Sequence, residues 1–293
     1  MNRNILTGFC AALLAVGFSS CGGGGVFSAK APVALEQAWA TDNTLRTPES
    51  AQYDPQRDVI YVSNINKTSR PQKDGDGFIS KLSPEGEIQE LYWVSGLNDP
   101  LGMALHNNVL YVADIDEVVA VSTQSGSVLG RYKADNARML NDVAVDNRGN
   151  VYITDTEEKR IYVLRNGRIT PWVEDTKISR PNGIFVDGNR MIVAFSGNGD
   201  VKLVDPETKK FTEWVEGIPS ADGIAAVPGG GYLISSWSGE IFYIDEKAKK
   251  WSLLNTSEQK INSADISYAE RPGLLLVPTF NDNRVVAYRL KNR

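Results

Sequence analysis

The chain of 293 residues has few of the side chains that most often carry chemistry in enzymes. It contains two cysteines, Cys10 and Cys21, both close to its start, and a single histidine, His106. Because the rest of the chain has no cysteine, we exclude disulfides, thiol nucleophiles and cysteine-based zinc sites from it. A single histidine also excludes a catalytic pair of histidines, and a Ser-His-Asp triad would have to use His106.

An excess of positive charge is missing as well. The formal net charge is -5, from 31 Lys and Arg against 36 Asp and Glu, and basic residues form no dense run. Nucleic acids and anionic membrane surfaces attract basic patches, so we expect neither as a partner of the folded domain. The 26 glycines and 13 prolines indicate many tight turns in a chain long enough to bury a substantial core.

Long hydrophobic runs are also missing, apart from residues 5–18, which are too few to span a bilayer. A basic residue precedes this run, and small residues, Cys21 and four glycines follow it, which is typical of an export signal. The pattern resembles a bacterial lipoprotein signal over residues 1–21, in which Cys21 is lipidated. We therefore predict an exported protein anchored by its lipid to a membrane, on the periplasmic or cell-surface side. An ordinary signal, cut near Ala29 or Ala31, is the alternative.

A repeat of about forty residues decides the architecture. After the start of each repeat come a second apolar run, a third strand-like segment, a polar turn and a fourth segment. Four short strands repeated six times predict an all-β fold, a six-bladed β-propeller with four antiparallel strands per blade. The six repeats begin at Glu49, Leu101, Asn141, Asn182, Asp222 and Ala264.

The last repeat has room for only three strands before the chain ends, so its fourth strand must come from elsewhere. The segment VALEQAWA, residues 33–40, lies just before the first repeat and can supply that strand. This closure pairs the two ends of the domain and removes two exposed sheet edges. We therefore expect one propeller over residues 33–293, preceded by a flexible tether over residues 22–32.

The starts of the repeats are expected to meet at one end of the central channel, because the first strand of each blade lines it. They bring two carboxylates and two carboxamides together, from Glu49, Asp222, Asn141 and Asn182. Capping of strand ends and turns is the alternative for each residue taken alone. Taken together, oxygen ligands without Cys or His favour a divalent cation, Ca²⁺ first, with Mg²⁺ or Zn²⁺ as alternatives.

Four segments resemble the gluconolactonase and regucalcin-like (senescence marker protein) family of six-bladed propellers. They are PESAQYDPQRDVIYVSNI, LNDVAVDNRGNVYITD, RPNGIFVDGNRMIVAFS and ADGIAAVPGGGYLISSW. The resemblance implies a divalent metal held by Glu49, Asn182 and Asp222. It places Asn141 near the metal and the substrate, with Asp142 following it. It also implies hydrolysis of a small-molecule substrate, a sugar lactone, with Asp222 as a metal ligand and catalytic base.

One position departs from the family's pattern. Family members carry an Arg that contacts the substrate two residues before the third-blade Asn, and here that position is Met139. Arg138 is adjacent, but neighbouring residues of a strand point to opposite faces. The resemblance therefore does not extend to recognition of a sugar acid.

The sequence thus predicts an exported, metal-dependent hydrolase of a lactone or similar ester. A non-catalytic propeller that binds a ligand or a protein partner is the alternative. Condensation chemistry, as in strictosidine synthase-like propellers, is a third hypothesis.

The ends of the second strands are expected to add side chains to the same rim. Asp114 and Asp155 would contact the hydroxyls of a ligand. Trp237 would stack on a flat ligand or cover a blade interface, and both interpretations stay open. His106 ends its inner strand and is expected at the far end of the channel. An insertion in the first blade, residues 65–76, is expected to form a lid over the channel mouth.

Overall fold

The computed structural model describes residues 30–66 and 71–293, and one compact unit runs from Ala31 to Arg293. The predicted signal peptide, the predicted lipidation site Cys21 and most of the predicted tether lie outside the described residues. No helix among the described residues has both the length and the hydropathy of a membrane span.

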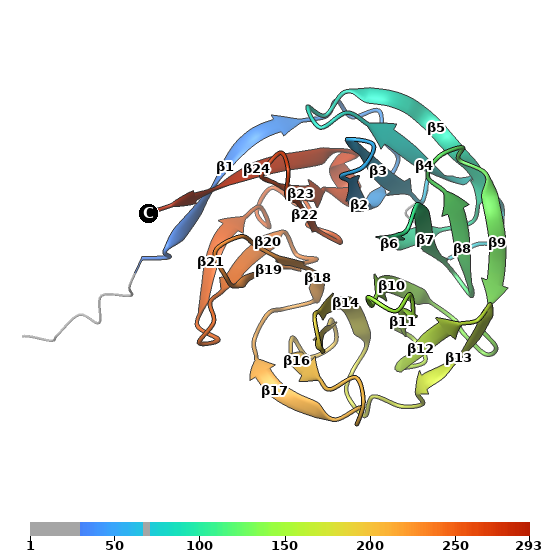
Figure 1. Ribbon diagram of the computed structural model, residues 1–293. Helices are drawn as coiled ribbons and strands as arrows, with labels where there is room; N and C mark the ends of the chain where they lie inside the picture. Colours follow the sequence, from blue (N-terminus) through green and yellow to red (C-terminus); the bar gives the residue numbers. More distant parts are fainter. Residues whose placement is uncertain (1–29, 67–70) are drawn as a thin grey trace, which may run out of the picture. The chain divides into compact units, whose positions relative to one another are not determined.

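Six four-stranded antiparallel sheets are arranged in a ring (Figure 1), which confirms the predicted six-bladed β-propeller. Each of the first five blades uses four consecutive strands, with the first strand innermost and the fourth at the outer edge. The described residues contain one short helical segment, the 3-10 turn η1 (Phe280–Asp282).

The strands of the first five blades follow one another in chain order. The first blade contains β2 (Pro48–Asp54), β3 (Val59–Asn64), β4 (Gly77–Leu82) and β5 (Ile88–Leu97). The second contains β6 (Pro100–His106), β7 (Val109–Asp114), β8 (Glu117–Ser122) and β9 (Val128–Lys133). The third contains β10 (Leu140–Val145), β11 (Val151–Asp155), β12 (Arg160–Arg165) and β13 (Arg168–Val173). The fourth contains β14 (Pro181–Asp187), β15 (Arg190–Phe195), β16 (Val201–Val204) and β17 (Phe211–Val215). The fifth contains β18 (Ala221–Ala226), β19 (Tyr232–Ser236), β20 (Glu240–Ile244) and β21 (Lys250–Asn255).

The sixth blade joins both ends of the unit. It contains β22 (Ser267–Ala269), β23 (Leu274–Pro278), β24 (Val285–Asn292) and, as its outer strand, β1 (Val33–Ala40). β1 runs antiparallel to β24, with Val33 opposite Asn292 (Figure 1), so the predicted closure by residues 33–40 is confirmed. Pairing of the two terminal strands completes the sixth blade and so closes the circle of blades.

The inner strand of the sixth blade is shorter than expected. The repeat predicted a strand from Ala264, whereas β22 begins only at Ser267. Asp265 instead forms a parallel bridge with Ser50 of the first blade, and its N–H donates to the carbonyl oxygen of Glu49 at 2.9 Å. The N–H of the preceding residue, Ala264, donates to the carbonyl oxygen of Pro278 in β23 at 3.1 Å, so the backbone here bonds both to its own blade and to the neighbouring one.

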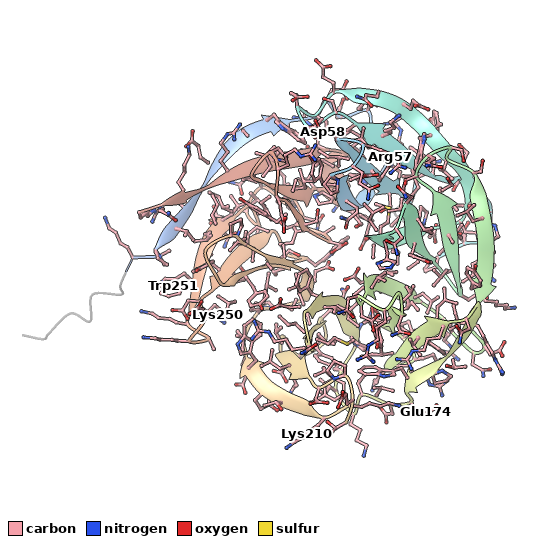
Figure 2. All side chains as sticks on the ribbon, in the orientation of Figure 1. Arg57, Asp58, Glu174, Lys210, Lys250 and Trp251 are labelled. Atoms are coloured by element: carbon pink, nitrogen blue, oxygen red, sulfur yellow. The ribbon has the colours of Figure 1, made fainter. Side chains whose placement is uncertain are left out.

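The core lies between the blades. Six clusters of buried apolar side chains occur in the described residues, one between each pair of neighbouring blades. Each sheet thus buries both faces, which explains why the second strands β3, β11 and β23 are buried along their whole length and begin with continuous apolar runs. The charged side chains of Glu174, Lys210 and Lys250 lie on the outer side of the blades (Figure 2).

Candidate functional site

A β-bulge interrupts the inner strand of each of the first five blades at the same place. In the third blade the register of β10 with β11 shifts between Leu140 and Val143, which takes Asn141 and Asp142 out of the regular alternation. Bulges re-aim side chains and are common beside active sites. The first bulge positions, which we call the ring, are Glu49, Leu101, Asn141, Asn182 and Asp222.

Hydroxyl groups on the second strands hold the ring in place. The N–H of Asp142 donates to Oγ1 of Thr154 at 3.0 Å, and this hydroxyl donates to the carbonyl oxygen of Asn182 at 2.7 Å. In the fifth blade the N–H of Gly223 donates in the same way to Oγ of Ser235, at 2.8 Å. Each of these hydroxyls also donates to the backbone of the next blade, so neighbouring ring positions are fixed relative to one another.

Glycine is required between two of the ring's blades because their backbones approach closely. A Cβ atom on Gly183 would lie 1.9 Å from the carbonyl oxygen of Asp222, and one on Gly223 would lie 2.3 Å from the amide nitrogen of Ile266. Neither position could hold a larger residue without a shift of backbone. The ring is therefore a rigid support for the side chains that it carries.

Within the part of the chain that the structure describes, three ring residues have a buried oxygen with no hydrogen-bond partner. These atoms are Oε2 of Glu49, Oδ1 of Asn182 and Oδ1 of Asp222. Their residues are only 4%, 9% and 2% exposed, and all three line one cavity. Buried polar atoms are nearly always paired in native proteins, because an unpaired one is costly. Three unpaired oxygens at one place fit a divalent cation that prefers oxygen ligands, such as Ca²⁺ or Mg²⁺.

The donor set is poorer in charge than many metal centres. Within residues 30–66 and 71–293, no three Asp, Glu, His or Cys side chains gather as a metal cluster. The candidate centre therefore consists of two carboxylates and one carboxamide, the residue types expected from the sequence at Glu49, Asp222 and Asn182. Without a histidine or cysteine ligand, the set favours Ca²⁺ or Mg²⁺ over Zn²⁺.

Four carboxylates lie within electrostatic reach of one another at the centre. Burial raises the pKa of Glu49 well above its usual value, and the charges of Asp222, Asp265 and Asp142 raise it further. Burial and then Asp265 raise the pKa of Asp222. No described Lys or Arg forms an ion pair with any of the four. Negative charge is thus concentrated where a cation would be most stabilising.

Asp142, predicted to contact the substrate, is directed away from the cavity that the ring lines. Its Oδ1 accepts a hydrogen bond from the N–H of Val143 at 2.6 Å, and its Oδ2 accepts one from Ile184 at 2.8 Å. Together with Asp265 it lines a second cavity of about 250 Å³. Its carboxylate therefore ties the third blade to the fourth.

The cavity above the ring has a volume of about 370 Å³. Its residues come from all six blades, at the end where the inner strands begin and the second strands finish. The predicted ligand contacts Asn141 and Trp237 are among them. The full lining is Glu49, Ile65, Pro71, Asp99, Leu101, Ile115, Met139, Asn141, Thr156, Arg180, Asn182, Ser196, Ser220, Asp222, Trp237 and Phe280.

Asp114, predicted to contact ligand hydroxyls, does not line this cavity. It is fully buried at the end of β7, where its Oδ1 accepts hydrogen bonds from the backbone N–H groups of Asn98 at 3.0 Å and Asp99 at 2.8 Å. The next residue, Ile115, lines the cavity instead. Asp155 is likewise buried, and its neighbour Thr156 lines the cavity. Because side chains alternate along a strand, the last strand residue and the one after it face different surroundings.

Aromatic side chains form one side of the cavity. Trp237 and Phe280 meet edge to face, with ring centroids 4.7 Å apart, and both line the cavity. The insertion of the first blade contributes Ile65 and Pro71, whereas residues 67–70 of the predicted lid lie outside the described residues. The segment after Pro71 is fastened to the second blade, because the N–H of Gln72 donates to Oδ2 of Asp99 at 2.8 Å.

Arg180 is a cavity residue that the sequence reasoning missed. It is the only Lys or Arg among the described residues that line the cavity, and it pairs with Glu157 at 3.0 Å. It stands two residues before Asn182, which is the position of Met139 relative to Asn141 in the preceding blade. Comparing each repeat at that position would have found it.

His106 lies away from this site. It ends β6, and it lines a different pocket together with Asp54, the last residue of β2, and Arg57 of the β2–β3 turn. Its side chain contacts Nδ2 of Asn107 at 2.8 Å. His106 therefore lies where the sequence predicted, at the end of its inner strand that is opposite to the ring.

Comparisons with known proteins connect the chain to other propellers through its fold. No family model and no curated protein matches the sequence. A catalytically inactive histidine-to-alanine variant of virginiamycin B lyase from Staphylococcus aureus, solved with quinupristin, superposes with a TM-score of 0.62 at 12% identity, covering 88% of this chain and 99% of that chain. A streptogramin B lyase gives a TM-score of 0.62 at 13% identity, covering 88% and 98%. At such identities the likeness shows the fold alone, so membership of the gluconolactonase-like family stays a prediction.

Proposed function

We propose that this propeller is a divalent-cation-dependent hydrolase of a lactone or similar ester. The observation that carries the proposal is the set of three unpaired, buried oxygens on Glu49, Asn182 and Asp222, which border a cavity of small-molecule size. These three residues would hold the cation, and Ca²⁺ is the ion that we favour. When bound, such an ion polarises a carbonyl oxygen and makes water more acidic.

The residues of the chain supply orientation and proton transfer. Asp222 has two carboxylate oxygens, so one can hold the cation while the other accepts a proton from the attacking water. Asn141 lines the same cavity and offers an N–H donor to the ester oxygen. Attack of water forms a new C–O bond at the carbonyl carbon, collapse of the adduct breaks the ring C–O bond, and the proton taken up by Asp222 passes to the leaving alkoxide, so that the product is a hydroxy acid.

The chemistry of the structural neighbours is not what we propose here. The variant of virginiamycin B lyase that is described as catalytically inactive lacks a histidine. The only histidine of this chain, His106, lies outside the cavity that holds the candidate cation site. A lyase that depends on a histidine at that cavity is therefore not supported by these residues.

Hydrolysis should depend on a divalent cation and not on the histidine. The purified full chain would be assayed against a panel of five- and six-membered lactones and aryl esters, after treatment with chelator and after addition of CaCl₂, MgCl₂ or ZnCl₂. We expect turnover that chelator abolishes and that one of the cations restores.

The His106→Ala protein is the matched control, and its turnover should equal that of the wild type. Loss of activity in this variant would show that His106 takes part in hydrolysis, which would contradict a reaction at the candidate cation site. A protein that binds a cation but turns over nothing in the panel would favour the non-catalytic propeller instead.

A further inference from the structure

The cavity is lined by both apolar and polar side chains. Ile65, Leu101, Ile115 and Met139 line it from the first three blades, and Trp237 and Phe280 line it from the fifth and sixth; we call these six side chains the apolar wall. The polar lining residues come from five of the blades: Arg180, Asn182, Ser196, Ser220 and Asp222 from the fourth and fifth, and Glu49, Asp99, Asn141 and Thr156 from the first three. A molecule bound at the ring would therefore meet the hydrocarbon of Leu101, Ile115 and Met139 as well as these polar groups.

The apolar wall cannot turn away from the cavity. Leu101 and Ile65 belong to the buried cluster between the second and third blades, and Met139 and Phe280 pack against that cluster. The wall is thus the open edge of the core, held by close packing. An apolar substituent that covered it would be removed from water without any rearrangement of the protein.

Ile115 supports this interpretation independently, through its backbone. It sits in the turn between β7 and β8 with a φ of 58°, in the left-handed region, which is a genuine outlier for a β-branched residue. Gly, Asn or Asp would adopt this conformation with less strain. The backbone is held there because the carbonyl oxygen of Ile115 accepts from the N–H of Leu140 at 2.8 Å. Strain of this kind clusters at ligand sites.

We propose that the substrate is a lactone or ester with an apolar substituent, rather than the polyhydroxylated sugar lactone that the resemblance implies. This inference rests on the proposed function, because it assumes that the carbonyl lies at Glu49, Asn182 and Asp222. The substituent lies against Leu101, Ile115 and Met139. A sugar lactone would instead place hydroxyl groups against hydrocarbon, where they lose their hydrogen bonds with water.

The test compares the kcat/KM of γ-butyrolactone with that of γ-lactones bearing linear alkyl chains of increasing length, and with that of glucono-δ-lactone. We expect kcat/KM to rise by up to about fourfold for each CH₂ that the wall covers. Glucono-δ-lactone should be the poorest substrate. A kcat/KM that does not change with chain length, or that is highest for glucono-δ-lactone, would overturn this inference. The proposed hydrolase function would still stand.

Variants of the wall residues test whether the wall sets the preference for long alkyl chains. Ile115→Asn should keep or raise the Tm, because Asn suits the left-handed backbone, yet it should reduce the gain with chain length. Met139→Gln, of similar size, should also reduce that gain, measured in each variant as the ratio of kcat/KM for the longest-chain lactone to kcat/KM for γ-butyrolactone. Leu129→Gln is the control, because Leu129 is 59% exposed on the outer strand β9. An unchanged chain-length profile in the Ile115 and Met139 variants would exclude the wall as the specificity element.

A binding measurement separates the inference from catalysis. If no lactone is hydrolysed even with added cation, the proposed function fails, and calorimetry with 2-alkylcyclopentanones then decides the inference. Affinity that rises with chain length, with a negative heat-capacity change that Ile115→Asn diminishes, would support the apolar site. Absence of binding at every chain length would refute it.

Discussion

The Asp222→Asn protein is expected to hydrolyse the best lactone about 1,000-fold more slowly than the wild type. Asparagine keeps the size of the side chain but cannot accept a proton, and it is a weaker ligand for a divalent cation. The loss should appear in kcat as well as in kcat/KM, because proton transfer belongs to the transition state. Steady-state kinetics with CaCl₂ in excess measure both constants.

The same exchange is expected to stabilise the cation-free protein at pH 7, on the order of 2 kcal/mol. Asp222 is buried, and Asp265 raises its pKa, so its charge is unfavourable when no cation is bound. Asp205→Asn makes the same change at an exposed turn, where hydrogen bonds from Thr208 lower the pKa of Asp205. That control should keep full activity and gain no stability. A less stable Asp222→Asn protein without cation would contradict the account of the centre.

Without a divalent cation, the free energy of unfolding is expected to fall as the pH rises from about 4 to about 7. Burial raises the pKa of Asp265 to about 7, so the folded protein binds more protons than the unfolded chain over this interval. A carboxylate with a raised pKa stabilises the fold at low pH and loses that contribution as the pH approaches the folded value. Asp265 alone corresponds to a loss on the order of 4 kcal/mol.

Urea denaturation at several pH values, with chelator or with excess CaCl₂, measures this dependence. The cation should remove most of the fall, since a ligand at 100 times its Kd adds about 2.7 kcal/mol of stability. Asp146 and Asp187 have lowered pKa values, so their contributions to the free energy of unfolding change only below the usual pKa of Asp. They therefore do not mask the fall in stability expected between pH 4 and pH 7. Stability that rises between pH 4 and pH 7 in chelator would show that the central carboxylates are paired in solution.

The sequence predicted the ring because its repeats are regular. Spacing alone placed Glu49, Asn182 and Asp222 at equivalent positions, and a propeller brings equivalent positions to one end of its channel. The closure by β1 followed from counting strands in the last repeat. Both predictions depend on patterns that many residues share, so a local irregularity could not overturn them.

It was harder to predict which residue at the end of a strand faces the cavity. Asp114 looked like a rim residue because it ends an apolar strand, but its carboxylate binds the backbone of the incoming loop, and Ile115 takes the rim. Periodicity also gave no sign that Asn141 and Asp142 occupy a bulge and face different cavities. Such details depend on which hydrogen bonds the neighbouring blade offers, as Ile184 does to Asp142.

Cation binding to the chelator-treated full chain, followed by titration calorimetry at pH 7, tests the central claim most directly. We predict one Ca²⁺ or Mg²⁺ site per chain, lost in Glu49→Gln and Asp222→Asn and weakened in Asn182→Ala. Affinity should drop as the pH falls, because the carboxylates must lose their protons to bind. Absence of binding by any divalent cation, or binding that all three variants retain, would contradict a cation centre at the ring.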